Sequence, residues 1–169
     1  QRQMCIRDSD ITVEYFKMRA AAEKNELGKA MMDFSINPND SRAAEIISKD
    51  PNQIGIIKTT CVATMLDAGH AENALPQSAS ANINCRLFPG TTVNEINSRL
   101  RQIISNPNIK INVSGTPKSA PASPLKEEVM DALRKAVHAQ YPDLPVIPYM
   151  TTGATDGRAL RAGGIPTYG

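Results

Sequence analysis

Residues 78–88 alternate between apolar and polar side chains, and this alternation constrains the fold more than any other feature of the sequence. The apolar set is Ala79, Ala81, Ile83, Cys85 and Leu87, and the polar set is Ser80, Asn82, Asn84 and Arg86. Because successive side chains of a strand point to opposite faces, the pattern predicts a strand with one face on a core and the other in water. The chain is therefore expected to contain a sheet that is exposed on one side.

Two further strands are predicted nearby. The run from Gly55 to Leu66 carries apolar or β-branched residues on both faces, which indicates a strand buried on much of both faces. Residues 109–113 alternate again and predict a third strand. Between the strands, residues 93–104 have an apolar stripe at helical spacing behind a capping box of Thr92 and Glu95, so we expect a helix there.

Helical spacing precedes the strands. From residue 10 onward, apolar side chains recur every three or four positions, with Asp10 or Thr12 as the expected N-cap, and a second short helix follows. A third helix is expected to begin at Asp40 or Ser41. Helices on one face of a small, mainly antiparallel sheet make an α+β domain, which we place at residues 10–115.

A proline-rich stretch separates this domain from the rest of the chain. Residues 116–124 contain three prolines, which predicts a linker. Ser123 is expected to cap a helix, and residues 146–149 and 165–167 are expected to form strands. Residues 125–169 are therefore predicted to be an incomplete α/β segment.

Both ends of the chain look cut. The opening run QRQMCIRDS resembles a translated sequencing-adapter scar, so we expect residues 1–9 to be a non-native leader. The compartment in which the protein works is left open by the sequence.

Composition excludes several function classes. The 169 residues include 19 basic and 17 acidic side chains, for a net charge of +2, and 41% of the residues are apolar. This composition is typical of a globular protein that is long enough to bury a core. The absence of a basic block and an aromatic content of only 4% argue against nucleic acid as a partner. No run approaches the roughly 18 apolar residues of a membrane span.

The three cysteines, Cys5, Cys61 and Cys85, stand far apart, with no Cys-x-x-Cys pair. This spacing indicates neither a disulfide framework nor a structural zinc site. We therefore expect all three to be small buried apolar residues.

Two histidines could be considered as metal ligands. His70 stands two residues before Glu72, as in a fragment of a metal site, but such sites need three or four converging ligands. The other histidine, His138, lies on a helix of the C-terminal segment. We therefore expect His70 to shape its loop, and we assign no metal ligand in this chain.

Arg86 is the more unusual feature. A guanidinium within a strand, on the face it shares with Asn82 and Asn84, is held rigidly and suits bidentate binding of a carboxylate. The alternative is a solvated arginine on an exposed sheet face. The loop from Gly153 to Asp156 places backbone N–H groups at the start of a helix, which favours an anion, although Asp156 could simply be an N-cap.

Several motifs resemble one enzyme family. These motifs are TTCVATML at 59–66, GHAENALPQ at 69–77, NCRLFPG at 84–90, GATDGR at 153–158 and GIPTYG at 164–169. Together they resemble the zinc-dependent metallopeptidases that include glutamate carboxypeptidase, aminoacylase, acetylornithine deacetylase and succinyl-diaminopimelate desuccinylase. The resemblance extends from about Asp10 to the end of the chain.

The resemblance implies a lid domain, which forms the homodimer, and a returning segment of a catalytic domain. It implies that Asn73 reaches across the dimer to the substrate, that Arg86 binds the substrate carboxylate, and that Gly153 and Thr155 line the substrate pocket. The family's two zinc ions are bound by residues that match none in this chain. The chain alone is therefore expected to be inactive.

The implied activity of the intact protein is hydrolysis of a small peptide or an N-acyl amino acid next to its free carboxylate, by zinc-activated water. The alternative function is a non-catalytic α+β module for dimerisation or regulatory binding. Such a module would need only residues 10 to about 115 and would leave the loop at Gly153 without a purpose.

Overall fold

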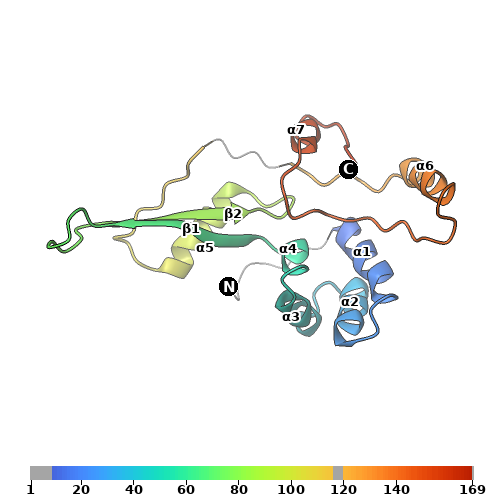
Figure 1. Ribbon diagram of the computed structural model, residues 1–169, viewed down its shortest axis with the longest axis horizontal. Helices are drawn as coiled ribbons and strands as arrows, with labels where there is room; N and C mark the ends of the chain where they lie inside the picture. The colour runs from blue at the N-terminus through green and yellow to red at the C-terminus, as the bar shows by residue number, and fades with distance from the viewer. Residues whose placement is uncertain (1–8, 116–119, 169) are drawn as a thin grey trace.

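The computed structural model describes residues 9–115 and 120–168, and it has α+β architecture, as predicted (Figure 1). The elements are α1 (Asp10–Ala20), α2 (Glu26–Ile36), α3 (Ser41–Lys49), α4 (Ile54–Ile57), β1 (Thr60–Ala68), β2 (Ala79–Arg86), α5 (Val93–Ile104), α6 (Glu127–His138) and α7 (Gly157–Ala162). The expected leader lies outside the described residues except for Ser9, and so do residues 116–119 of the linker expected at 116–124. The division of the chain into domains therefore stays a prediction.

The apolar core lies among the first four helices. Its fully buried large side chains are Phe16, Met31, Phe34, Ile47, Ile56 and Ile57. The rings of Phe16 on α1 and Phe34 on α2 meet edge to face, with their centroids 5.4 Å apart. Edge-to-face packing of buried rings stabilises a core beyond the area that it removes from water.

Two of the expected helix starts, those of α3 and α5, are confirmed. The Asp40 carboxylate accepts from the N–H groups of Arg42 and Ala43, as expected for the cap of α3. At α5 the predicted capping box of Thr92 and Glu95 is present. At α1 the cap is Ser9 rather than Asp10 or Thr12, because the hydroxyl of Ser9 accepts from the Thr12 N–H.

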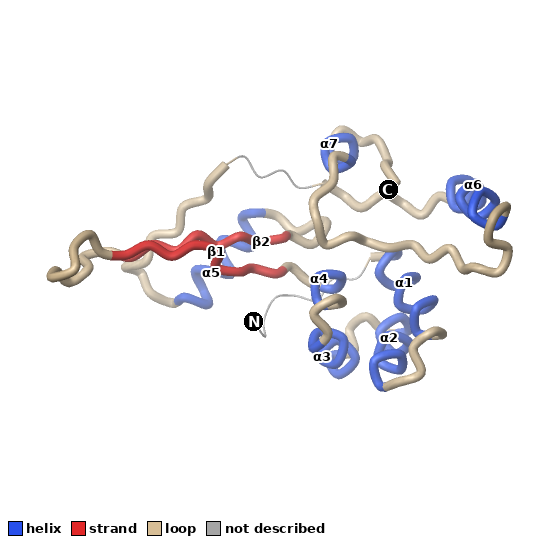
Figure 2. The backbone as a smooth tube through the Cα atoms, in the orientation of Figure 1, coloured by secondary structure: helices blue, strands red, loops and turns tan. Residues whose placement is uncertain are grey.

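The strands β1 and β2 form a long antiparallel hairpin that extends away from helices α1–α4 (Figures 1 and 2). The first residues of the predicted strand form α4 instead, and β1 begins at Thr60. From Val62 onward β1 is exposed, so the expectation of burial on both faces of the first strand is wrong. β2 is exposed on both faces except at Cys85, so the expectation that one of its faces lies on a core is also wrong. An apolar run does not determine what covers it, because that depends on the elements packed against it.

The third predicted strand is wrong. Residues 109–113 are all described and adopt no strand, and the Ile111 carbonyl accepts from Arg101 on α5 at 3.3 Å. An alternating pattern forms a strand only where a sheet edge supplies partners for its backbone groups. Here α5 and its connections separate this segment from the hairpin in sequence, and β2 pairs with β1 alone within the described residues.

The C-terminal segment also lacks its predicted strands. Residues 146–149 and 165–167 are described as irregular chain, shown as loop in Figure 2. The first of these runs across the helical core, where Ile147 and Met150 pack against it and the Tyr149 ring lies 5.5 Å from the ring of Tyr15. A segment can thus be held by packing on helices rather than by a sheet.

The prediction that Ser123 caps a helix is wrong, because α6 begins at Glu127 and its N-cap residue is Lys126. Instead the Ser123 hydroxyl donates to the Thr167 carbonyl oxygen at 2.7 Å, and the Thr167 N–H donates to the Ser123 hydroxyl oxygen at 2.9 Å. These bonds hold the start of the segment beside its end.

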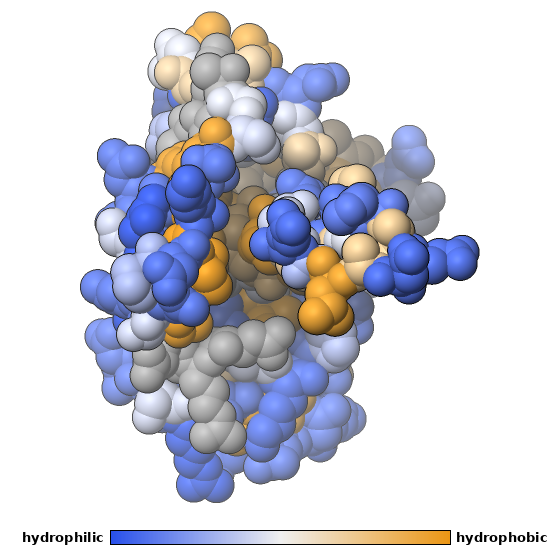
Figure 3. All heavy atoms as spheres, turned by 90° about the vertical axis from the view of Figure 1, so that its left-hand side faces the viewer, coloured by the Kyte–Doolittle hydropathy of each residue, from blue (hydrophilic) through white to orange (hydrophobic). Residues whose placement is uncertain are grey.

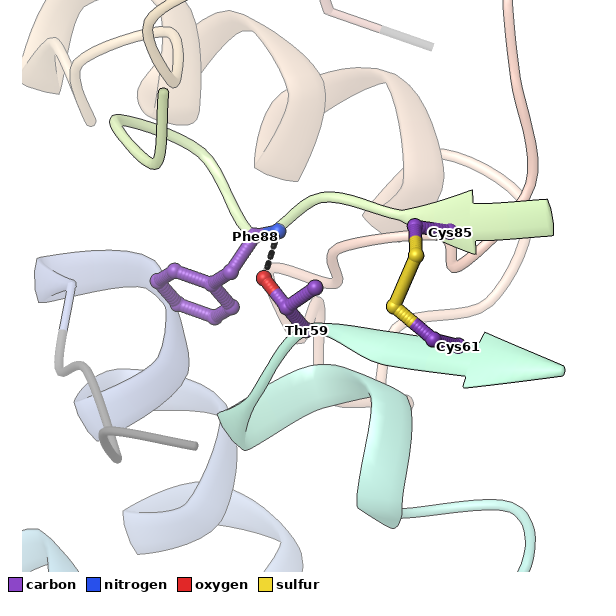
Figure 4. Close-up of a disulfide and its surroundings, with 4 residues drawn as sticks. All are labelled: Thr59, Cys61, Cys85 and Phe88. Carbon is purple, nitrogen blue, oxygen red and sulfur yellow. Dashed lines mark hydrogen bonds between the residues drawn. A yellow bond between two sulfur atoms is a disulfide. The ribbon is translucent and has the colours of Figure 1, made fainter. Parts of the chain in front are cut away.

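Cys61 and Cys85 form a disulfide, so the interpretation of these two residues as separate buried thiols is wrong (Figure 4). They stand directly opposite each other in the ladder, with their Cα atoms 4.1 Å apart. The expectation for Cys5 falls outside the described residues. A cross-link between residues 24 apart stabilises the folded state by about 3 kcal/mol, mainly by restricting the unfolded chain.

Candidate functional site

The candidate site lies at the root of the hairpin, where the two strands leave the helical part. The Phe88 N–H donates to the buried Thr59 hydroxyl oxygen at 2.9 Å and closes the root (Figure 4). The next pairs outward are Thr60 with Arg86 and Cys61 with Cys85. Arg86 is thus the last residue of β2, rather than lying in the middle of a strand as the sequence suggested.

Arg86 joins the hairpin to the loop that precedes α7. Its Nη1 donates to the Thr152 carbonyl oxygen at 3.0 Å, across 66 residues of sequence. A guanidinium carries five N–H donors, and this bond uses one of them. The structure therefore brings Arg86 and the predicted Gly153 loop together, and the arginine is not simply solvated.

The loop at residues 151–156 has its own internal bonds. The Gly153 N–H donates to the Thr151 hydroxyl oxygen at 3.3 Å, and the Arg158 N–H donates to the Thr155 carbonyl at 3.1 Å. Within the described chain, the Asp156 side chain caps none of the N–H groups of α7, so it is not a simple side-chain N-cap. The loop provides the Thr152 carbonyl that Arg86 binds. Thr155, three residues later, is half-buried.

Lys58 directly precedes Thr59 at the root of the hairpin and is a second positively charged residue there. Its ammonium donates to the Ser48 hydroxyl at 3.0 Å, which ties the root to α3. Partial burial lowers the pKa of this lysine, because the charged form loses hydration. The cationic group exposed at the site is therefore Arg86, with Lys58 turned to the helices.

Asn73 lies at the other end of the hairpin. It belongs to the exposed tip between β1 and β2, at the far end of the molecule in Figure 1. The length of β2, at about 3.3 Å per residue, places the tip more than about 20 Å from Arg86. Asn73 and Arg86 are therefore not brought together within one chain.

The two histidines lie apart from this site. His70 and Glu72 are exposed in the hairpin tip, whereas His138 ends α6, with its Nε2 3.0 Å from the Leu144 carbonyl oxygen. Across residues 9–115 and 120–168, no three His, Cys, Asp or Glu side chains converge to hold a metal ion.

The hairpin exposes many apolar side chains. Val62, Met65, Leu66, Leu75 and Ile83 are all exposed. Figure 3, which looks toward the hairpin end, shows apolar and polar side chains interspersed over this face.

None of the described helices is long and apolar enough to cross a membrane.

Comparison with known families decides what kind of chain this is. The family model for the M20 peptidase dimerisation domain matches residues 21–112, which is more than half of the chain. The chain belongs to the M20 peptidase dimerisation family. The M20 match includes the hairpin with Arg86 and Asn73, and the Gly153 loop lies beyond it.

Curated relatives are similar to this M20 chain at low identity. The probable carboxypeptidase S-like 2 of Dictyostelium discoideum is 28% identical over 116 residues, which cover 68% of this chain and 22% of the relative. The N-fatty-acyl-amino acid synthase/hydrolase PM20D1 of Mus musculus is 27% identical over 118 residues, covering 68% and 24%. The PM20D1 of Bos taurus is 31% identical over 106 residues, covering 61% and 21%.

The chain therefore spans about a quarter or less of the length of these relatives. No solved structure matches this chain.

Sequence reasoning missed the Thr152 carbonyl that Arg86 binds. A backbone acceptor has no signature of its own in the sequence. The one available signal was its position next to Gly153, in the motif already singled out.

Proposed function

We propose that this chain is part of a zinc-dependent hydrolase that cleaves a peptide or N-acyl amide bond next to a free carboxylate, and that Arg86 binds this carboxylate. The observation that carries the proposal is the bond from Arg86 to the Thr152 carbonyl, because it places the guanidinium against the loop of Gly153 and Thr155. Both substrate classes in the names of the relatives, carboxypeptidase substrates and N-acyl amino acids, have a free carboxylate.

The residues of this chain would bind and orient the substrate. Arg86 would offer a pair of N–H donors to the two carboxylate oxygens, a geometry that fixes direction as well as charge. The Thr152 carbonyl would hold the guanidinium through a further N–H, and Gly153 and Thr155 would line the pocket. Two bound zinc ions would supply an activated water, held by residues outside this chain.

The same proposal gives Asn73 a role in a homodimer. Since the hairpin tip is far from Arg86 of its own chain, Asn73 would serve the site of the second subunit. Among the residues that the structure describes, β1 and β2 pair only with each other, so the outer edge of each strand could accept a symmetry mate. In this scheme residues 10–115 are the lid and residues 125–169 belong to the catalytic domain.

The activity test uses a full-length enzyme that contains this chain. We expect it to hydrolyse N-acyl amino acids or small peptides with a free C-terminal carboxylate, and to lose this activity on chelation until zinc is restored. The 169-residue chain alone should retain no zinc after dialysis and show no amidase activity. A full-length protein that dimerises but hydrolyses no such amide would favour the non-catalytic module instead.

Self-association of the hairpin can be tested on the chain itself. We expect the 169-residue chain to form dimers in sedimentation at high micromolar concentration, and Leu66→Asp to shift it toward monomer. Leu66 is 80% exposed on β1, and a charge placed in a buried interface lacks compensation.

The matched control is Ile36→Asp on α2, where the side chain is 77% exposed but lies away from the hairpin. This variant should dimerise like the unmodified chain. A strictly monomeric unmodified chain, or equal dimerisation of both variants, would contradict a dimer through the hairpin.

A further inference from the structure

The Cys61–Cys85 disulfide stands directly beside the candidate site. Cys85 immediately precedes Arg86 on β2, and Cys61 immediately follows Thr60, the ladder partner of Arg86. Both cysteines are half-buried, at the boundary between the buried root and the exposed outer hairpin. The cross-link is therefore one residue away from the guanidinium that reaches Thr152.

The outer hairpin gives little support to the register at this point. A two-stranded hairpin with both faces in water is marginally stable. The ladder is also irregular two residues outward, where a bulge between Ala63 and Met65 shifts the pairing. Exposed strands are weakly specified in register, and a slip of one residue would turn Arg86 to the opposite face of the hairpin.

We propose that the Cys61–Cys85 disulfide is a positioning element for Arg86, which makes carboxylate binding at this site dependent on the redox state of the hairpin. The covalent bond keeps Cys61 opposite Cys85, and this pairing keeps Thr60 opposite Arg86. Figure 4 shows the disulfide and the hydrogen bond from the Phe88 N–H to the Thr59 hydroxyl. The pair of Thr60 and Arg86 lies between these two links in the ladder and is therefore held from both sides. This inference rests on the proposed role of Arg86 in binding the substrate carboxylate.

The redox step needs a two-electron reductant. A phosphine is oxidised to its oxide with oxygen from water, and a dithiol acts by exchange. A dithiol transfers two electrons and two protons to the disulfide, its own sulfurs become a disulfide, and Cys61 and Cys85 become two thiols. An oxidised thiol compound such as glutathione disulfide reverses the exchange. The reduced hairpin keeps its hydrogen bonds but loses the covalent constraint on its register.

The test compares oxidised and reduced forms of a full-length enzyme that contains this chain, with an N-acyl amino acid and its carboxamide as substrates. We expect reduction by a phosphine to raise KM for the free acid about tenfold, because misplacing a binding group by about 1 Å can cost this much or more. The kcat for the acid and the kcat/KM for the carboxamide should stay within about twofold. Reoxidation should restore the original KM.

The chain offers a control variant without the disulfide. Cys61→Ser with Cys85→Ser should have the KM of the reduced enzyme in both redox conditions. The redox state can be read from one tryptic peptide, since residues 59–86 contain no internal Lys or Arg. This peptide should take up two alkyl groups only after reduction.

If alkylation shows full reduction and KM for the free acid does not change, the disulfide does not position Arg86. The same conclusion follows if kcat falls equally for both substrates, since that result indicates a general structural role. If the oxidised enzyme shows no preference for the free acid over the carboxamide, the proposed function itself fails. Should the double variant not fold, the reversible reduction of the unmodified enzyme decides the question.

Discussion

Arg86→Ala in the full-length enzyme is expected to lower kcat/KM for substrates with a free carboxylate by about 100-fold. This loss corresponds to about 2.7 kcal/mol, the range expected when charge-assisted hydrogen bonds to a carboxylate are removed. Arg86→Lys should also lose about tenfold or more, because an ammonium cannot reproduce the two parallel bonds of a guanidinium. Steady-state kinetics on one N-acyl amino acid measures both effects.

The folded state should tolerate these substitutions. Arg86 is exposed, and its described hydrogen bond is the one to the Thr152 carbonyl, so the free energy of unfolding should change by no more than about 0.5 kcal/mol. Urea unfolding of the variants provides this control. A loss of activity that tracks a loss of stability would show that Arg86 acts through the fold and not through the substrate.

Phe34→Ala is expected to produce the largest loss of stability. The Phe34 side chain is fully buried between helices and meets the Phe16 ring, so its removal leaves a cavity at the centre of the core. Such truncations cost about 3–5 kcal/mol. Urea unfolding of the 169-residue chain, followed by far-UV circular dichroism, should show a correspondingly lower midpoint.

Ile36→Ala is the matched control for this prediction. Ile36 lies on the same helix two residues later but is 77% exposed, so its truncation should change stability by no more than about 0.5 kcal/mol. Equal destabilisation by the two variants would mean that α2 does not pack in the orientation described.

Two helix caps were predicted correctly from the sequence, whereas the predicted strand partners were not. The cap at Asp40 and the capping box before α5 depend on residues within three positions of each other, so the sequence alone specifies them. The strands expected at 109–113 and 146–149 needed a neighbouring edge, which periodicity cannot supply. The second of these segments is instead held by packing on the helical core.

The candidate site divides in the same way. Alternation along residues 78–88 predicted one face on a core and one in water, but both faces of β2 are exposed, with Ile83 at 44%, so Arg86 is exposed without a buried face behind it. Its partner Thr152 lies 66 residues away, and the cysteine pair lies 24 residues apart. Both relations follow from how the hairpin pairs and where the C-terminal loop crosses it, which no local pattern encodes.

The most direct measurement of the central claim is a double-mutant cycle between Arg86 and the substrate carboxylate. It requires kcat/KM of the full-length enzyme and of Arg86→Ala, each with an N-acyl amino acid and with its carboxamide. If Arg86 binds the carboxylate, the substitution should cost about 100-fold on the acid and no more than about twofold on the carboxamide. An equal loss on both substrates would contradict the assignment of Arg86 as the carboxylate-binding residue.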